Sequence, residues 1–153
     1  NRGSATLTMN EIRAITDKSE LEGTAYVELL PGKYRDSCWN DGSLFFEEEV
    51  FGYFEPSIKK HVPDFDHYAF TEMDAVQCAL VASSLRELAG SAQSAATVEQ
   101  LEGNIGFIFQ GSAQRFEDDL PENLSALAWL AEELADWLVV QASSHEHVSI
   151  LGL

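Results

Sequence analysis

DLPENLSALAWLAEELADWLVVQA, residues 119–142, is the stretch that decides the fold, because its apolar residues recur at helical spacing. The resulting stripe consists of Leu120, Leu124, Leu127, Ala131, Leu134 and Leu138. Further apolar residues widen this face, namely Trp129, Leu130, Trp137 and Val140. Asp119 and Glu122 stand at the spacing of a capping box. We therefore predict a long helix over about residues 120–142 that is mostly buried, or that buries part of itself against a partner.

A second helix is predicted upstream of it. Thr71 and Asp74 form a start that resembles a capping box, with Asp in place of the usual Glu. The apolar stripe that follows is Cys78, Val81, Leu85 and Leu88. Gly90 is expected to end this helix, and residues 91–96 are expected to form a small polar linker.

Strands are expected mainly in the N-terminal part of the chain. Residues 24–30, TAYVELL, are rich in β-formers, and Pro31-Gly32 marks a turn after them. Tyr34 to Trp39 is predicted to be the return strand of a hairpin, with a second turn at residues 40–42. Other short apolar segments are candidate strands: residues 67–70, residues 105–109 and, at the edge of the sheet, residues 148–153.

The segment SLFFEEEVFGYFEPSIKKHV, residues 43–62, fits two structures. Its aromatic and aliphatic residues lie at helical spacing, whereas residues 44–46 alone fit a third strand. We favour a helix interrupted near Gly52 and Pro56, because Glu47-Glu48-Glu49 suits an exposed helical turn better than a strand.

Together these elements predict one α+β domain over residues 9–153, with a small antiparallel sheet that begins with the N-terminal hairpin and packs against three to four helices. A chain of 153 residues fits a single domain with a core that needs no metal or disulfide. Residues 1–8 precede Met9, and we interpret them as residues added ahead of a natural start. Cys38 and Cys78 are expected to be free thiols in a reducing cytoplasm, with Cys78 buried.

The charge balance is strongly acidic. The sequence has 26 acidic and 9 basic residues, which gives a formal net charge of −17. After Arg86 the only basic residue is Arg115. Such a chain is repelled by nucleic acid and by anionic membranes, and it attracts basic partners. No apolar run of about 18 residues, the length of a membrane span, occurs in the sequence. We therefore expect a cytoplasmic protein with a basic protein partner.

Catalytic motifs are missing from the sequence. It contains no GxSxG, P-loop, HExxH or GxGxxG pattern. The densest polar cluster, His61, Asp64, Asp66 and His67, has the ligand types of a divalent metal site, and a metal-dependent hydrolase is the alternative that it supports. These residues surround a proline in an expected loop, however, so we favour turn formation. We predict that the chain is not an enzyme and has no cofactor.

Aromatic and acidic residues are interleaved between residues 45 and 70. Some of these aromatic side chains must build the core. Those left at the surface among carboxylates would suit an Arg- and Lys-rich protein surface. The predicted partner-binding residues are Glu47, Glu48, Glu49, Tyr53, Glu55, Asp64 and Asp66. The competing acidic surface is Glu117, Asp118, Asp119 and Glu122. Reversing the charge of Glu47, Glu48 and Glu49 is expected to leave folding nearly intact.

Residues 54–88, FEPSIKKHVPDFDHYAFTEMDAVQCALVASSLREL, resemble a pattern of small bacterial immunity proteins, which neutralise polymorphic or contact-dependent toxins. The shared features are an aromatic-acidic segment, then PDFDHY at residues 63–68, then Thr71-Glu72 at the start of an amphipathic helix. The resemblance spans roughly residues 43–90 and carries over no site residue. It implies a non-enzymatic cytoplasmic inhibitor that blocks the active site of a toxin, often a basic nuclease or deaminase. An acidic adaptor or regulatory domain remains a further alternative.

Overall fold

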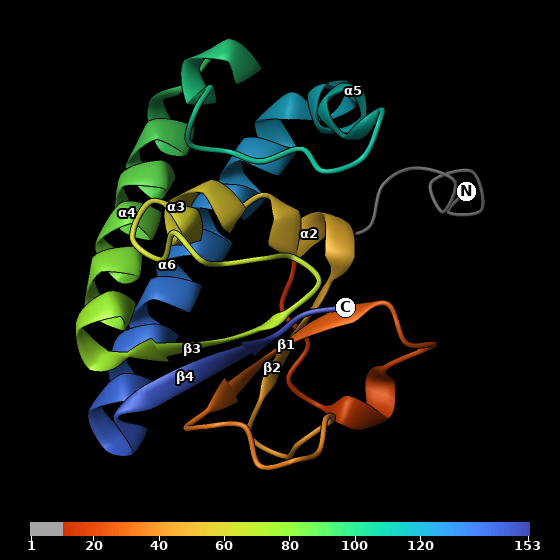
Figure 1. Cartoon of the computed structure of the whole chain (residues 1–153). Helices are drawn as coiled ribbons and strands as arrows, with labels where there is room; N and C mark the ends of the chain where they lie inside the picture. Colours follow the sequence, from red (N-terminus) through yellow and green to blue (C-terminus); the bar gives the residue numbers. More distant parts are fainter. Residues whose placement is uncertain (1–10) are drawn as a thin grey trace.

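The structure, a computed structural model, describes residues 11–153 (Figure 1). The interpretation of residues 1–8 as added residues lies outside this range. Within the described residues, four strands form one antiparallel sheet in the order β2-β1-β4-β3. The strands are β1 (Tyr26–Pro31), β2 (Leu44–Glu47), β3 (Phe70–Asp74) and β4 (His147–Leu151). The helices are α2 (Glu48–Gly52), α3 (Glu55–Lys59), α4 (Ala75–Ser94), α5 (Ser112–Asp118) and α6 (Leu120–His145), with 3-10 turns η1 (Lys18–Glu20) and η2 (Val98–Leu101). The predicted α+β class is confirmed.

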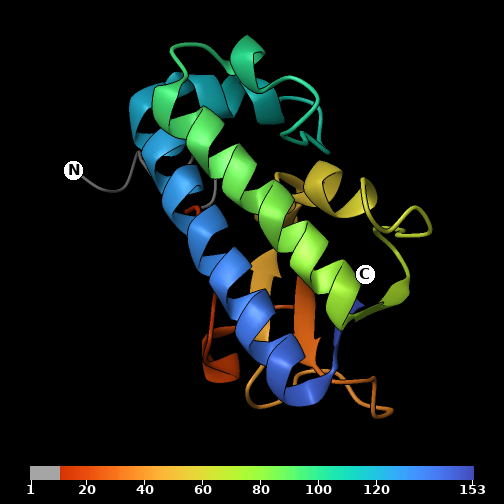
Figure 2. The same cartoon turned by 90° about the vertical axis from the view of Figure 1, so that its left-hand side faces the viewer.

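The two long helices, α4 and α6, lie side by side over one face of the sheet (Figures 1 and 2). Both predicted helices are therefore confirmed, and their apolar stripes point into the core. The start of α4 differs from the prediction, because Asp74 is the N-cap and forms its capping box with Gln77, while Thr71 lies in β3. Gly90 does not end α4, which continues to Ser94. Buried alanines prolong its packed face, and this packing outweighs the low helix propensity of glycine.

The segment from residue 34 to residue 47 folds differently from the prediction. β1 is confirmed, but its hairpin partner is β2, with Tyr26 opposite Glu47 and Leu29 opposite Leu44. The return strand expected at Tyr34 to Trp39 is wrong, and so is the helix expected over residues 44–47. Residues 44–46 are buried, as befits a strand with both faces covered, and the helical turn begins only at Glu48.

The C-terminal strand occupies an interior position in the sheet. β4 pairs with β1 on one side and with β3 on the other, so the prediction of an edge strand is wrong. Val148 and Ile150 belong to the core under the helices. Burial of both apolar side chains stabilises β4 in an interior position of the sheet. Ile105 is buried, but residues 105–109 form no strand.

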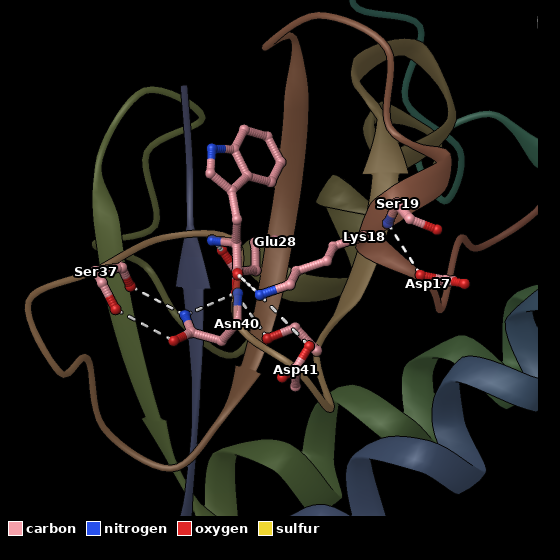
Figure 3. Close-up of polar contacts among 9 residues, drawn as sticks. Asp17, Lys18, Ser19, Glu28, Ser37, Asn40 and Asp41 are labelled. Carbon is pink, nitrogen blue, oxygen red and sulfur yellow. Dashed lines mark hydrogen bonds and ion pairs between the residues drawn. The ribbon is translucent and has the colours of Figure 1, made fainter.

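The loop between β1 and β2 covers the other face of the sheet and is tied to it by one buried carboxylate. The carboxylate of Glu28 accepts hydrogen bonds from Trp39 N at 2.7 Å, from Asn40 N at 3.0 Å and from Ser43 Oγ at 2.7 Å (Figure 3). It also accepts one from Asn40 Nδ2 at 2.9 Å. Asp36 and Trp39 have φ angles of +68° and +63°, which no regular strand contains. The backbone donors of this segment thus bind Glu28 rather than a neighbouring strand.

Both cysteines are free in the described residues, Cys38 at the surface and Cys78 in the core. This agrees with the prediction.

Candidate functional site

Three of the seven predicted partner-binding residues, Glu55, Asp64 and Asp66, line a cavity of about 740 Å³ that we call the α3 cavity. Three segments form its walls. These are the end of α2 with α3, the loop at residues 63–67 and the extended segment at residues 106–108. The walls are partly apolar, and acidic side chains accompany them: Glu55, Asp64 and Asp66. The α3 cavity therefore brings together three of the predicted acidic residues, while the other four predicted residues lie outside its lining.

Two glycines let the walls of the α3 cavity approach each other. Gly106 N donates a hydrogen bond to Tyr53 O at 3.2 Å. A Cβ atom at position 106 would lie 2.3 Å from Gly52 O, which is too close for any side chain. Glycine at position 106 is therefore required to hold the segment 106–108 against α2, and this contact positions Phe107 and Ile108 beside the cavity.

A histidine between two glutamates joins the loop at residues 63–67 to α2 and α3. His67 Nε2 lies 2.7 Å from Glu48 Oε2, and His67 Nδ1 binds the carboxylate of Glu55. Burial alone would lower the pKa of His67, but its hydrogen bonds to Glu55 and Glu48 outweigh this and raise it. Burial raises the pKa of Glu55, and His67 opposes that rise. An imidazolium at this place donates from both nitrogens, so it acts as a clamp and leaves no nitrogen free to accept a substrate proton.

This clamp predicts a pH-dependent stability. The folded-state pKa of His67 is raised above its usual 6.5, so its stabilising effect is complete below about pH 6.5 and is lost as the pH rises through the folded-state pKa. We expect the free energy of unfolding of the parent to decrease as the pH rises through that window. The His67→Gln variant should show no such decrease. Urea denaturation across pH measures both, with His61→Gln as the control. A parent and a His67→Gln variant with parallel curves would contradict the clamp.

Asp64 and Asp66 are the exposed acids of the α3 cavity. Asp66 Oδ1 accepts a hydrogen bond from Tyr68 N at 2.8 Å, which confirms the expected turn chemistry. Neither carboxylate forms an ion pair with the described part of the chain. The neighbouring Lys59 Nζ donates to Phe65 O at 3.3 Å. Both carboxylates are therefore available to a cationic partner.

Two of the predicted partner-binding residues lie in the interior. Tyr53 is fully buried, and its ring packs edge-on against Phe107 and Phe116. Glu49 is also buried and accepts from Arg115 Nη2 and from Ser112 Oγ, each at 2.5 Å. The expectation that these two side chains face a partner is wrong, because Tyr53 belongs to the core and Glu49 is buried in an ion pair with the half-buried Arg115. The lone Arg115 in the acidic half of the sequence was the available signal for such a pair.

The remaining members of the predicted face are less buried. Glu47 and Glu48 are half-buried, and burial raises the pKa of Glu47. Of the aromatic residues between 45 and 70, six are core residues: Phe45, Phe46, Phe51, Tyr53, Phe54 and Phe65. Tyr68 and Phe70 are exposed. Most of the aromatic content of this segment thus builds the core, and few aromatic side chains remain for a partner.

The four residues of the candidate metal cluster do not converge. His61 Nε2 lies 2.6 Å from Ser84 Oγ on α4, whereas His67 binds the two glutamates. Among residues 11–153, no group of three or more His, Cys, Asp or Glu side chains is arranged to hold a metal ion. The hydrolase alternative gains no support from this arrangement.

No protein-family model, curated protein or solved structure matches this chain. None of the helices in the described residues is long and apolar enough to cross a membrane.

Proposed function

We propose that this chain is a cytoplasmic immunity protein that binds a basic bacterial toxin, of nuclease or deaminase type, and neutralises it by covering its active site. The observation that supports this most is the α3 cavity, where unpaired carboxylates stand beside apolar walls on a chain with a net charge of −17. Asp64 and Asp66 supply the free charge, and Phe107 and Ile108 supply apolar contact area.

Mimicry of nucleic acid is the physical mechanism. A toxin that acts on nucleic acid holds phosphates in a basic cleft, and carboxylates of the inhibitor would take the place of those phosphates. Opposite charges also steer the encounter and raise the association rate above the ~10⁵–10⁶ M⁻¹s⁻¹ of neutral pairs. Contacts in a partly apolar cavity then slow dissociation.

Capture of the partner from the native host, followed by an activity assay, tests this function. We expect a basic protein whose nuclease or deaminase activity falls to zero at one equivalent of this chain. The gene beside that of this chain is expected to encode it. A partner that is neither basic nor toxic would overturn the proposal. A basic toxin that keeps its activity when fully bound would overturn the blocking mechanism.

Neutralising the exposed acids of the α3 cavity should weaken binding to the captured toxin. In the double variant Asp64→Asn and Asp66→Asn, the amide at position 66 retains the oxygen that accepts from Tyr68 N. The association rate is expected to fall about tenfold and to depend less on salt, because electrostatic steering contributes factors of that order. Stopped-flow mixing at low and high salt measures it.

The matched control is Asp118→Asn with Asp119→Asn in the competing acidic surface, which removes the same charge. It should change the association rate much less. A larger loss in this control would place the docking face at the start of α6 instead.

A further inference from the structure

A second concave surface, separate from the α3 cavity, runs along α6. It has a volume of about 510 Å³ and lies between α6 on one side and β2 with residues 13–16 on the other. We call it the α6 groove. Apolar side chains dominate its lining, among them Leu44 and Phe46 of β2 and Trp129, Trp137 and Val140 of α6. Figure 2 shows α6 as one of the two long helices at the front of the molecule.

The apolar side chains on α6 at this groove exceed what the fold requires. The core stripe of α6 is already buried against α4 and the sheet. Trp129 and Val140 are nevertheless 62% and 57% exposed, and Trp137 is half-buried. Trp137 and Val140 are three residues apart, and Trp129 lies about two turns earlier on the same side of the helix. These apolar side chains flank two acidic ones in the lining, Glu133 and Asp136. An exposed tryptophan such as Trp129 beside an apolar groove is typical of the anchor residues of protein interfaces.

The charges at the α6 groove determine which partner fits it. Glu133 lines the groove, is exposed and has no partner among the described residues. Asp136 also lines it and binds Arg86 Nη2 at 2.8 Å. The one cation in the lining, Arg13, lies 3.5 Å from Glu11 and 3.7 Å from Glu20, so its charge is already compensated. The free charge at the groove is therefore negative.

We propose that the α6 groove docks an amphipathic helical segment of a partner protein, with apolar residues in the groove and Lys or Arg beside Glu133. This mode buries one apolar helix face in a hydrophobic groove. A second copy of this chain fits poorly, because two molecules of net charge −17 repel each other. Residues 1–10 fit poorly as well, because they contain a single cation, Arg2, and only two large apolar residues, Leu7 and Met9.

The three tryptophan side chains supply a direct test. Each indole N–H gives its own NMR signal in the full chain, assignable through Trp→Phe variants. The probe is a synthetic amphipathic helical peptide made of Leu and Lys, and the matched peptide carries Glu in place of Lys. We expect the Leu-Lys peptide to shift the signals of Trp129 and Trp137 saturably. Trp39 stacks on Phe45 at the opposite face of the sheet from Phe46, so its signal should stay in place. The Leu-Glu peptide should shift none of them.

Matched variants separate groove binding from general attraction to an acidic surface. Val140→Ser removes an exposed apolar contact inside the groove. Val76→Ser on α4 removes a valine that is 68% exposed, somewhat more than Val140, and that lies outside the groove. We expect Trp129→Ala to weaken binding about tenfold, as loss of an anchor residue does. Val140→Ser should weaken it less, and Val76→Ser should leave it unchanged.

Four results would overturn the proposal. The first is an equal shift of Trp39, and the second is an equal loss of affinity in Val76→Ser. The third is a shift of the Trp129 and Trp137 signals when residues 1–10 are removed without any peptide, which would make that segment the occupant. The fourth is a shift that follows protein concentration, which would make a second copy the occupant. The peptide assay needs no toxin, so its failure is distinguishable from failure of the proposed function.

Discussion

Replacing Glu28 with alanine is expected to lower the free energy of unfolding by about 3 kcal/mol. Each buried donor that loses its acceptor costs about 1–3 kcal/mol, but only the Ser43 donor is fully buried, and the part-buried donors on Trp39 and Asn40 can bind water instead. The Glu28 carboxylate is the acceptor for two backbone N–H groups, Trp39 N and Asn40 N, and for two side-chain donors. No other acceptor for the two backbone N–H groups is present in the described chain, because the loop residues pair with no neighbouring strand. Urea denaturation monitored by circular dichroism measures the loss.

Two further variants test the cause of this loss. Glu72→Ala removes an exposed glutamate from β3 of the same sheet and should change stability within about 0.5 kcal/mol. Glu28→Gln keeps one acceptor oxygen but turns an NH₂ group toward donors. Its free energy of unfolding should therefore lie between those of Glu28→Ala and Glu72→Ala. Amide exchange at Trp39 and Asn40 should accelerate in Glu28→Ala. If Glu28→Ala were as stable as Glu72→Ala, the loop would not depend on this carboxylate.

Replacing Glu49 with lysine is expected to lower the free energy of unfolding by about 3 kcal/mol, the lower end for breaking a buried ion pair, because Glu49 is buried but the Arg115 side chain is 36% exposed. The new ammonium group would lie beside the Arg115 guanidinium, and Ser112 Oγ would lose its acceptor. The triple reversal of Glu47, Glu48 and Glu49 should therefore unfold much of the protein. This corrects the expectation from the sequence that the triple variant folds almost normally. Thermal and urea unfolding of the single variant measures the effect.

A charge swap provides the control for this pair. Adding Arg115→Glu to Glu49→Lys restores opposite charges at the two positions and should recover part of the lost stability. Asp64→Lys, at an exposed position, should stay within about 0.5 kcal/mol of the parent. A Glu49→Lys protein as stable as Asp64→Lys would show that the pair of Glu49 and Arg115 contributes little to stability.

The acidic segment at Glu47 to Glu49 illustrates why a site is harder to predict than a helix. In the sequence, three adjacent glutamates indicated one exposed, charged surface. In the structure each has a different environment: Glu47 is half-buried at the end of β2, Glu48 binds His67 and Glu49 binds Arg115. Burial and partners differ because consecutive residues at a strand-to-helix junction point in different directions.

The sequence by itself determined the features that repeat at a short period along the chain. This group includes the apolar stripes of α4 and α6 and the first strand, because helical and strand periodicity are properties of neighbouring residues. The excess of negative charge also follows from the sequence alone, because it depends only on composition. Tertiary structure alone decided the rest. It placed β4 between β1 and β3, and it brought Arg115 to Glu49 across 66 positions. It also turned residues 34–39 away from the sheet toward Glu28. Each of these outcomes depends on a partner far along the chain, whose desolvation and hydrogen bonding outweigh local propensity.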